Sequence, residues 1–315
     1  MRVWHGLGEV PRSFGPCVVT IGVLDGVHRG HRALLARARQ HADDRGLPLV
    51  AVTFDPHPAS VVAPGREPEL LGTVADRVRL LSAAGADAVL VLAFTPELAA
   101  LPAEEFVSAV LVATLRAAVI TVGEDFRFGH RAAGDIGTLE SMAGAGGGGG
   151  GGGYALDAVG LQSDGQERFS STRVRALLAA GDVGAAAEIL GRPYALTGAV
   201  LQGDKRGREL GFPTANLACP PGVAVPPDGV YAGWLEDAGE RWPAAISVGS
   251  NPTFTGASRR VEAYALDRDD LELYGHEVTV SFVARLRDMV AFDSVDALVV
   301  QMHADVDTAR ELLRS

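Results

Sequence analysis

The chain has 315 residues, of which 47% are hydrophobic and 21% are charged. This is the composition of a globular protein that is long enough to form two hydrophobic cores. The formal net charge is −11, and both halves of the chain are acidic. Neither half therefore has the basic excess that is typical of a nucleic-acid-binding protein.

The sequence also disfavours several other classes of protein. No segment approaches the ~18 consecutive apolar residues of a membrane span, and residues 1–10 lack an apolar signal region, so we expect a cytoplasmic protein. Cys17 and Cys219 have no CxxC partner, which argues against a disulfide framework or structural zinc and predicts two buried thiols. Lys205 is the only lysine, and no GxxxxGK[ST] sequence of the P-loop nucleotide hydrolases is present.

The first half alternates short β-branched segments with helical segments rich in Ala, Leu and Arg. This alternation is typical of a parallel sheet covered by helices on both faces, with ligands at the carboxyl ends of the strands. A glycine run at 146–153 is interpreted as a surface loop rather than a substrate lid. The predicted strands are 18–22, 49–54, 88–92, 119–123 and 155–159, and the predicted helices are 31–45, 74–84, 103–116 and 172–190, the last interrupted at Gly181-Asp182.

The pattern changes after residues 191–193 to closely spaced strands separated by turns. Such strands indicate a small antiparallel barrel, and an amphipathic helix at 295–313 is expected to pack against it. We therefore divide the chain into domains 1–186 and 187–315. The predicted strands of the second domain are 195–201, 229–235, 244–248, 261–265 and 277–282.

An HxGH tetrad, from His28 to His31, follows the first predicted strand and begins a helix. Backbone N–H groups and the helix dipole attract anions at a strand-to-helix turn of this kind. Gly22, Gly26 and Gly30 allow a triphosphate to approach the backbone, and the two histidines can donate hydrogen bonds to phosphates and to leaving pyrophosphate. Alone, the tetrad is equally compatible with a chance pair of surface histidines, and no third ligand is spaced to complete a zinc site.

The segment RFSSTRVR at 168–175 is a second candidate for phosphate binding. Ser171 or Thr172 can cap a helix, which would place Arg175 in its first turn, where a guanidinium can hold the β- and γ-phosphates. An ordinary helix cap followed by solvated arginines would have the same sequence. The prolines of FDPHP at 54–58 are expected to stop a strand, and strand ends line the crevice of such a sheet.

In the second half, GDKRGRELGFPTAN at 203–216 combines a basic, glycine-containing turn with a short polar pair. The backbone N–H groups of the turn can cradle ATP phosphates. Thr214 and Asn216 alternate on an extended segment, so both oxygens face one side and can hold Mg²⁺, which prefers hard oxygen ligands. A solvated hairpin turn is the alternative. Glu262 lies in a predicted strand, where an ordinary exterior carboxylate would leave its two apolar neighbours facing inward.

These motifs resemble those of the prokaryotic bifunctional riboflavin kinase/FAD synthetases over nearly the whole chain. The resemblance implies that the second domain phosphorylates riboflavin to FMN with ATP, and that the first adenylylates FMN to FAD and releases pyrophosphate. It also implies a Rossmann-like nucleotidyltransferase sheet of the α/β class, followed by an all-β, six-stranded antiparallel Greek-key barrel with a terminal helix. The matching motifs are TIGVLDGVHRGH (20–31), VTFDPHP (52–58), VGEDFRFG (122–129), FSSTRVR (169–175), GDKRGRELGFPTAN (203–216), PDGVY (227–231), ISVGSNPTF (246–254) and VEAY (261–264).

The resemblance also implies roles for individual residues. In the first domain His28 and His31 are the catalytic candidates. In the second, Glu262 is the general base for the ribityl 5′-hydroxyl of riboflavin, with Thr214 and Asn216 as Mg²⁺ ligands. The candidates for nucleotide binding are Gly22, Asp25, Gly30, His57, Asp125, Arg168, Ser171, Thr172 and Arg175 in the first domain and Gly203, Lys205, Gly207 and Asn251 in the second.

The implied partners are riboflavin, FMN, FAD and ATP, without nucleic acid or membrane. Two alternative functions are also considered for this sequence. The chain could be a nucleotidyltransferase for another phosphorylated metabolite, with the barrel as a flavin-sensing regulatory module. A barrel that binds nucleic acid is the other alternative, and the acidic charge and the lack of a basic, aromatic face disfavour it.

Overall fold

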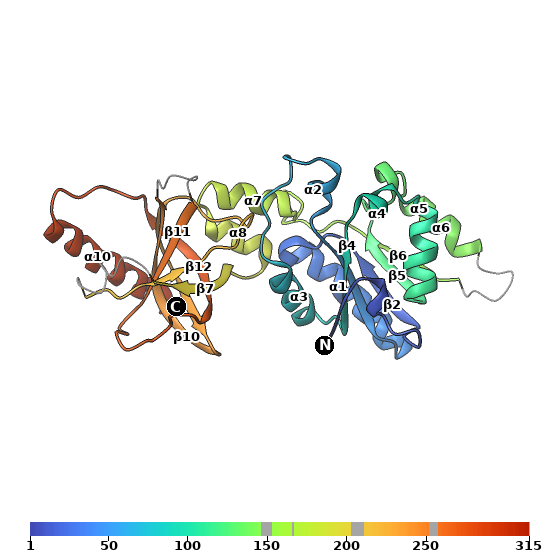
Figure 1. Ribbon diagram of the computed structural model, residues 1–315, viewed down its shortest axis with the longest axis horizontal. Coiled ribbons are helices and arrows are strands. Elements are labelled where there is room, and N and C mark those ends of the chain that lie inside the picture. The colour runs from blue at the N-terminus through green and yellow to red at the C-terminus, as the bar shows by residue number, and fades with distance from the viewer. Residues whose placement is uncertain (146–152, 166, 203–210, 252–257, 315) are drawn as a thin grey trace. The chain divides into compact units, whose positions relative to one another are not determined.

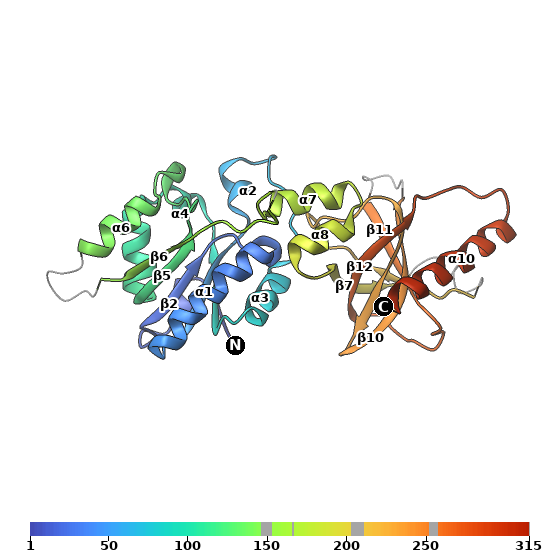
Figure 2. The same cartoon turned by 180° about the vertical axis from the view of Figure 1, so that it is seen from behind.

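The computed structural model describes residues 1–145, 153–165, 167–202, 211–251 and 258–314, and Figures 1 and 2 show it from two sides. It divides into two compact units, the first formed by residues 1–68 and 74–169 and the second by residues 69–73 and 170–315. The predicted glycine loop, apart from Gly153, lies outside the described residues, as do the predicted phosphate-binding residues Gly203, Lys205 and Gly207.

The first unit is built on a parallel sheet of six strands in the order β1–β4–β3–β2–β5–β6. The strands predicted from the sequence are confirmed, and β1, at one edge of the sheet, is an addition to them. The strands are β1 (Arg2–His5), β2 (Cys17–Ile21), β3 (Leu49–Asp55), β4 (Ala88–Ala93), β5 (Ala117–Gly123) and β6 (Ala155–Val159).

Helices cover both faces of this sheet. Val18 of β2 packs into one core with α1 and α3, which lie in front of the sheet in Figure 2, whereas Val19 and Ile21 pack into another core with α5, η3 and α6. This alternation follows from the two-residue period of a strand and explains why the central strands β2, β3, β4 and β5 are largely apolar on both faces. The helices are η1 (Leu7–Glu9), η2 (Asp25–Val27), α1 (Arg29–Arg45), α2 (Pro58–Val62), α3 (Val74–Ala83), α4 (Pro96–Ala100), α5 (Ala103–Phe106), the π-helical η3 (Val107–Thr114), η4 (His130–Ala132) and α6 (Ile136–Ala145).

The second unit contains a closed antiparallel barrel in the order β10–β11–β8–β7–β12–β9. The helix α10 packs on the outside of the barrel through a small core that includes Phe212, Ala232 and Val306. The predicted interruption at Gly181-Asp182 is confirmed, because the Asp182 carboxylate accepts a hydrogen bond from the Ala185 N–H and caps α8. The elements are α7 (Ser171–Ala179), α8 (Val183–Leu190), β7 (Tyr194–Leu201), β8 (Ala215–Leu217), β9 (Gly229–Asp237), β10 (Glu240–Asn251), β11 (Ser258–Ala265), β12 (Glu277–Arg287) and α10 (Val295–Leu313).

The two cysteines differ in their surroundings. Cys17 is fully buried in β2, and its Sγ donates to the Leu115 carbonyl oxygen (3.1 Å). Cys219 is only partly buried, because it lies beyond the end of β8. The prediction of two buried thiols is therefore correct for Cys17 and wrong for Cys219. Within the described part of the chain, no helix is both long enough and apolar enough to span a bilayer.

Candidate functional site

The HxGH tetrad lies at the carboxyl end of β2, in the turn that begins α1. His28 is the N-cap of α1 and is 5% exposed, and its Nδ1 accepts a hydrogen bond from the His31 N–H (3.4 Å). The two imidazole rings are stacked with their centroids 3.6 Å apart. A Cβ atom at position 30 would lie 3.1 Å from the His28 ring, so Gly30 leaves room for this pair. The predicted strand, turn and helix are confirmed, and they bring both histidines to a helix N-terminus that favours anions.

The backbone of this turn is strained. Leu24, Gly26 and Val27 have positive φ angles of 54°, 74° and 40°. Such angles are costly for leucine and above all for a β-branched residue such as valine. Both of these side chains are buried in the core beneath α1, so tertiary packing holds them in place. The position of His28 therefore depends on a turn that its local sequence alone would not favour.

A buried arginine that the sequence analysis does not identify lies behind this turn. Arg77 of α3 is 3% exposed, and its Nη1 donates to Thr53 Oγ1 (3.1 Å) and to the Phe54 carbonyl oxygen (2.9 Å). Its Nη2 lies 3.9 Å from Oδ1 of Asp25, which is also buried. The Thr53 hydroxyl in turn donates to the Val23 carbonyl oxygen (2.8 Å). These contacts connect α3 to the ends of β2 and β3.

The protonation of His31 is affected by the same neighbours. Burial lowers the pKa of His31 well below its ordinary value, and the charges of His28 and Arg77 lower it further. Its imidazole is therefore neutral near pH 7. The Nδ1 atom of His31 is buried and has no hydrogen-bond partner in the described ranges. A neutral imidazole keeps one N–H donor, which is the group needed to bind a phosphate oxygen.

The other candidates of the first unit occupy different positions. His57 is the N-cap of α2, and its Nδ1 accepts a hydrogen bond from the Ala59 N–H (3.1 Å). Asp125 and Arg168 form an ion pair in which Nη1 and Oδ2 are 3.1 Å apart. Both partners are more than half exposed, so the pair contributes only about 0–1 kcal/mol to stability and both groups are accessible to a ligand.

The prediction for the cap of the following helix is wrong. Ser170, rather than Ser171 or Thr172, is the N-cap of α7, and its Oγ accepts a hydrogen bond from the Arg173 N–H (3.2 Å). The reason is conformational: an N-cap is non-helical, and Ser170 has extended angles (φ −151°, ψ 152°), whereas Ser171 already belongs to the helix. Arg175 consequently lies in the second turn, where its Nε donates to the Glu69 carbonyl oxygen (2.5 Å).

In the second unit, a cavity of about 290 Å³, which we call the α10 cavity, lies between the outer face of the barrel and α10. Its volume is close to the lower end of the ~300–1,000 Å³ of typical small-molecule pockets. Most of its lining is apolar, with a few polar groups at defined positions. The lining includes Phe212, Tyr264, Met289, Phe292 and Met302 among the apolar residues and Thr214, Ser247, Glu262, Arg287 and Asp305 among the polar ones.

Glu262 is positioned in the α10 cavity by the barrel itself. It is paired with Asn216 of β8 on one side and with Ser247 of β10 on the other. Its side chain is 32% exposed, and its Oε1 lies 3.6 Å from the Arg260 Nη1. The opposite wall of the cavity is α10. The carboxylate of Asp305, a residue of α10, attaches this helix to β12.

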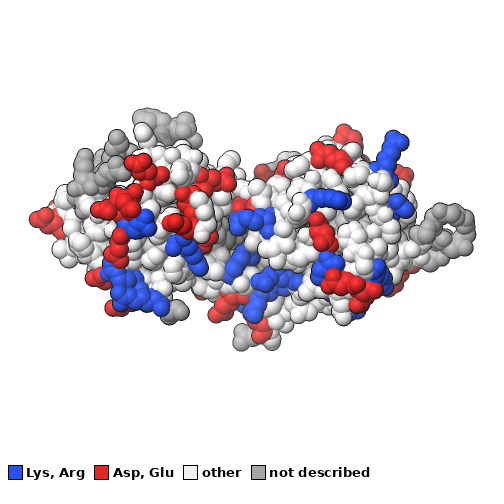
Figure 3. All heavy atoms as spheres, turned by 90° about the horizontal axis from the view of Figure 1, so that it is seen from below, with Lys and Arg blue, Asp and Glu red and all other residues white. Residues whose placement is uncertain are grey.

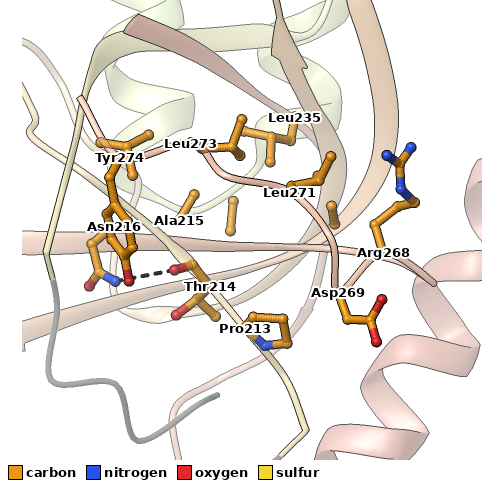
Figure 4. Close-up of a pocket in the computed structure, with 13 residues that line it drawn as sticks. Pro213, Thr214, Ala215, Asn216, Leu235, Arg268, Asp269, Leu271, Leu273 and Tyr274 are labelled. Atoms are coloured by element: carbon orange, nitrogen blue, oxygen red, sulfur yellow. Dashed lines mark hydrogen bonds between the residues drawn. The ribbon is translucent and has the colours of Figure 1, made fainter. Parts of the chain in front are cut away.

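A second, smaller cavity, the β8 cavity, borders Thr214 and Asn216 (Figure 4). In that view Leu235, Leu271 and Leu273 lie on one side of the cavity and the polar pair on the other. Asn216 Oδ1 is buried and has no hydrogen-bond partner within the described ranges, while Nδ2 donates to the Thr214 carbonyl oxygen (3.4 Å). A buried oxygen that receives no hydrogen bond is a suitable ligand for a cation, and amide and hydroxyl oxygens suit Mg²⁺.

The two cavities meet at one residue, because Thr214 lines both of them. Asn251 is the last residue of β10, and the surroundings of its side chain lie outside the described part of the structure. The structure therefore brings together Asn216 of β8, Glu262 of the adjacent β11, and Thr214, which directly precedes β8. In the first unit it brings His28 and His31 together, with Arg77 and Asp25 behind them.

A parallel sheet with an anion-binding turn, followed by a barrel with two adjoining cavities, defines a two-part enzyme that transfers groups from nucleotides. Comparisons with known families agree with this division. The sequence model of FAD synthetase matches residues 10–173, and that of riboflavin kinase matches residues 190–313. On the face shown in Figure 3, acidic and basic side chains are interspersed.

Individual relatives match over almost the whole chain. The bifunctional riboflavin kinase/FMN adenylyltransferase of Escherichia coli K12 is 37% identical over 314 residues, covering 99% of this chain and 96% of the relative. That of Pseudomonas fluorescens is 38% identical over 313 residues, covering 99% and 98%. A solved structure from Streptococcus pneumoniae, described as a macrolide-efflux protein, has a TM-score of 0.87 and 31% identity and covers 98% of this chain and 99% of its own.

The chain belongs to the bifunctional riboflavin kinase/FMN adenylyltransferase family. The predicted fold class is confirmed, and so are the two predicted activities, with ATP as co-substrate and with riboflavin, FMN and FAD as the flavin partners. The riboflavin kinase match over the barrel argues against both alternatives, the flavin-sensing module and the nucleic-acid-binding barrel.

Proposed function

We propose that the HxGH turn of the first unit adenylylates FMN, and that the α10 and β8 cavities of the second unit phosphorylate riboflavin. In terms of the chain, we assign the first reaction to residues 1–186 and the second to residues 187–315. We also propose that the enzyme works in the cytoplasm. The observation that carries the assignment is that Thr214 lines both cavities, so a flavin in one and a nucleotide in the other would meet beside Glu262.

In the adenylylation, a phosphate oxygen of FMN attacks the α-phosphorus of ATP, and pyrophosphate leaves. The backbone N–H groups at the start of α1 and the imidazole N–H groups of His28 and His31 stabilise the charge on the transferred and leaving phosphates. Gly22 and Gly30 let the phosphates approach the backbone. Within the first unit, we assign the remaining contacts to the predicted nucleotide ligands His57, Asp125 and Arg168. The predicted ligands Ser171, Thr172 and Arg175 belong to α7 of the second unit.

Asp25 requires a different role from direct nucleotide binding. Its side chain is buried, and Arg77 lies beside it. A carboxylate in that position cannot reach a ligand in the turn without rearrangement. We therefore propose that Asp25 supports the turn from behind.

In the phosphorylation, Glu262 accepts the proton of the ribityl 5′-hydroxyl, and the hydroxyl oxygen attacks the γ-phosphorus of ATP, so that ADP leaves. The apolar lining of the α10 cavity suits the isoalloxazine ring, and Gly203, Lys205, Gly207 and Asn251 are proposed to bind ATP. Thr214 and Asn216 would hold Mg²⁺, which neutralises charge on the phosphates when it is bound. The unpartnered Asn216 oxygen supports this ligand pair.

The full-length His28→Ala/His31→Ala variant tests the division of labour. If each histidine supplies a donor to the transition state, removal of one donor costs ~10²–10³-fold in kcat, so FAD formation from FMN should collapse. Phosphorylation of riboflavin should continue at its normal rate. Flavin products are separated by chromatography. His41→Ala is the matched control, since His41 also lies on α1 but pairs with Asp157. Equal loss of both activities, or full retention of FAD formation, would contradict the assignment.

A further inference from the structure

Arg77 links three segments that meet at the carboxyl edge of the first sheet. It donates hydrogen bonds to Thr53 and Phe54 at the end of β3. The Thr53 hydroxyl in turn donates a hydrogen bond to Val23, in the turn after β2. A guanidinium presents several donors in a rigid, planar fork, so one side chain can fix more than one segment. The turn is therefore tied to α3 through β3.

The burial of Arg77 also demands an explanation. A buried cation is unfavourable unless it is hydrogen-bonded and near an opposite charge. Arg77 satisfies both conditions, because Asp25 lies 3.9 Å from its Nη2. That distance is too long for a hydrogen bond, so Asp25 acts on Arg77 through charge. Asp25 itself belongs to the turn, only three residues before His28.

The strain of the turn gives these contacts a mechanical consequence. Leu24 and Val27 hold positive φ angles that an isolated chain would abandon. Relaxation at Val27 would rotate the chain at the next residue, which is His28, the N-cap of α1. Restraints on Val23 and Asp25 oppose this relaxation from the other end of the turn.

We propose that Arg77 is a positioning residue for adenylyl transfer, which holds the strained turn between Gly22 and His28 so that His28 and His31 face the phosphates. Its burial keeps it from touching the nucleotide. The inference rests on the proposed assignment of adenylylation to the HxGH turn. The positive charge of Arg77 has a second effect that can be measured, because it also opposes protonation of His31.

Three full-length variants test the proposal. Arg77→Met removes both the fork and the charge, Arg77→Lys keeps the charge, and Arg79→Met is the control. Arg79 lies two residues further along α3 and is exposed, where it pairs with Asp76. For each variant we would measure kcat and KM of FMN adenylylation, with riboflavin phosphorylation in the same sample as the reference for enzyme concentration and the thermal unfolding profile as the reference for a folded first unit.

We expect Arg77→Met to lower the kcat of adenylylation by ~10²-fold, as misplacement of reacting groups by about 1 Å does, with a smaller change in KM. Arg77→Lys should recover most of this loss, to within about tenfold of the parent. Riboflavin phosphorylation should not change. In NMR titrations of labelled histidine, the pKa of His31 should rise in Arg77→Met but not in Arg77→Lys or Arg79→Met.

Thr53 provides an independent variant if Arg77→Met does not fold. Thr53→Val removes the hydroxyl that joins Arg77 to Val23, whereas Thr53→Ser keeps it. Only Thr53→Val should lower the kcat of adenylylation, and its effect should not add fully to that of Arg77→Met, because both break one connection.

The proposal is overturned if adenylylation by Arg77→Met stays within about twofold of the parent, a loss too small for displaced reacting groups. It is also overturned if both activities fall together, or if Thr53→Val and Thr53→Ser behave alike. Failure of the underlying assignment looks different. In that case His28→Ala/His31→Ala retains adenylylation, whatever the Arg77 variants do.

Discussion

Glu262 lies on the outside of the barrel, because its neighbours Val261 and Ala263 are buried inside it. The alternation of inward and outward side chains along the strand, which predicts that Glu262 faces outward, is therefore confirmed. The packing of α10 over this part of the exterior changes the result, since it makes the carboxylate part of the wall of a largely apolar cavity. A side chain there can work on a bound flavin while remaining outside the barrel.

Glu262→Gln should lower riboflavin phosphorylation by ~10²–10⁴-fold, the usual loss for a general base. The amide keeps the shape of the carboxylate but cannot accept the proton, so the affinity for riboflavin should stay nearly constant. Single-turnover phosphorylation and riboflavin binding measured side by side check this. Glu236→Gln, an exposed glutamate on β9 paired with Arg241, is the control. A normal rate in the Glu262 variant would remove this residue from the mechanism.

The thiols give a prediction for the native protein. Burial raises the pKa of Cys17 to about 12 and that of Cys219 to about 11. Because the thiolate is the reactive form, both cysteines should react slowly with a disulfide reagent at pH 8, and the partly buried Cys219 should react first. In guanidinium chloride both should react at once. A rapid stoichiometric reaction in the native protein would show that one of these thiols is accessible and ionised.

The site residues that the sequence could predict are those whose spacing is local. His28 and His31 belong to one turn, and Thr214 and Asn216 to one extended segment, so a short motif places each pair. Arg77 could not be found in this way, because its contacts come from strands brought together by the fold, and its own helix resembles a solvated charged surface. Ser170 could not be identified as the N-cap for a simpler reason: several adjacent residues have hydroxyl side chains that suit this position.

Among the described residues, two charged pairs join the terminal helix α10 to the rest of the second unit: Arg310 with the exposed Asp267, and Arg287 with the buried Asp305. Arg287 of β12 binds Asp305 in two parallel hydrogen bonds, Nε to Oδ1 at 2.9 Å and Nη2 to Oδ2 at 2.7 Å. Gln301 donates to the same carboxylate (2.9 Å). Since α10 forms one wall of the flavin cavity that we propose, this pair should matter for both stability and substrate binding.

Asp305→Asn should destabilise the second unit by about 3 kcal/mol, at the lower end of the range for breaking a buried pair, because Arg287 loses its counter-ion. Urea unfolding followed by tryptophan fluorescence measures this, since Trp234 lies in β9 and Trp242 in β10. The KM for riboflavin should rise as the wall loosens. Asp307→Asn, an exposed neighbour that pairs with Arg310, should change stability by less than about 0.5 kcal/mol. Similar effects of the two substitutions would contradict this role.

The elements that the sequence could predict are those with a pattern long enough to detect. The limits of α10 coincide with the predicted 295–313, and the central strands agree to within a few residues. The short β1, β8, α2 and α4 escape prediction, because elements of three to five residues are stabilised by neighbours rather than by their own periodicity. The change from α5 to the π-helical η3 has no signal in the apolar pattern of 103–116.

At the scale of the whole molecule, the chain forms two compact units, and α7 and α8 belong to the second. The proposed boundary at residue 187 falls within α8, whose buried residues include Val183 and Ala186. Two fragments, 170–315 and 187–315, therefore differ in whether this helix is complete.

The fragment 170–315 should unfold cooperatively and make FMN from riboflavin without making FAD. The fragment 187–315 should make the same product but unfold at a lower temperature, because it loses α7 and part of the apolar face of α8. Thermal unfolding and product chromatography on both fragments provide the check. Identical melting would show that α7 and α8 do not support the barrel, and a folded but inactive longer fragment would show that the kinase site needs residues outside 170–315, such as 69–73 of the same unit.

The position of the α10 cavity outside the barrel has a consequence for how such an enzyme can change over time. The side chains that fill the barrel, such as Tyr231, Val280 and Phe282, are different from those that face the cavity. Mutations among the first group alter resistance to heat, and mutations among the second alter which compound is accepted. Natural selection can therefore adjust thermal tolerance and chemical selectivity at different positions, except at residues such as Asp305, which line the cavity and also hold α10 in place.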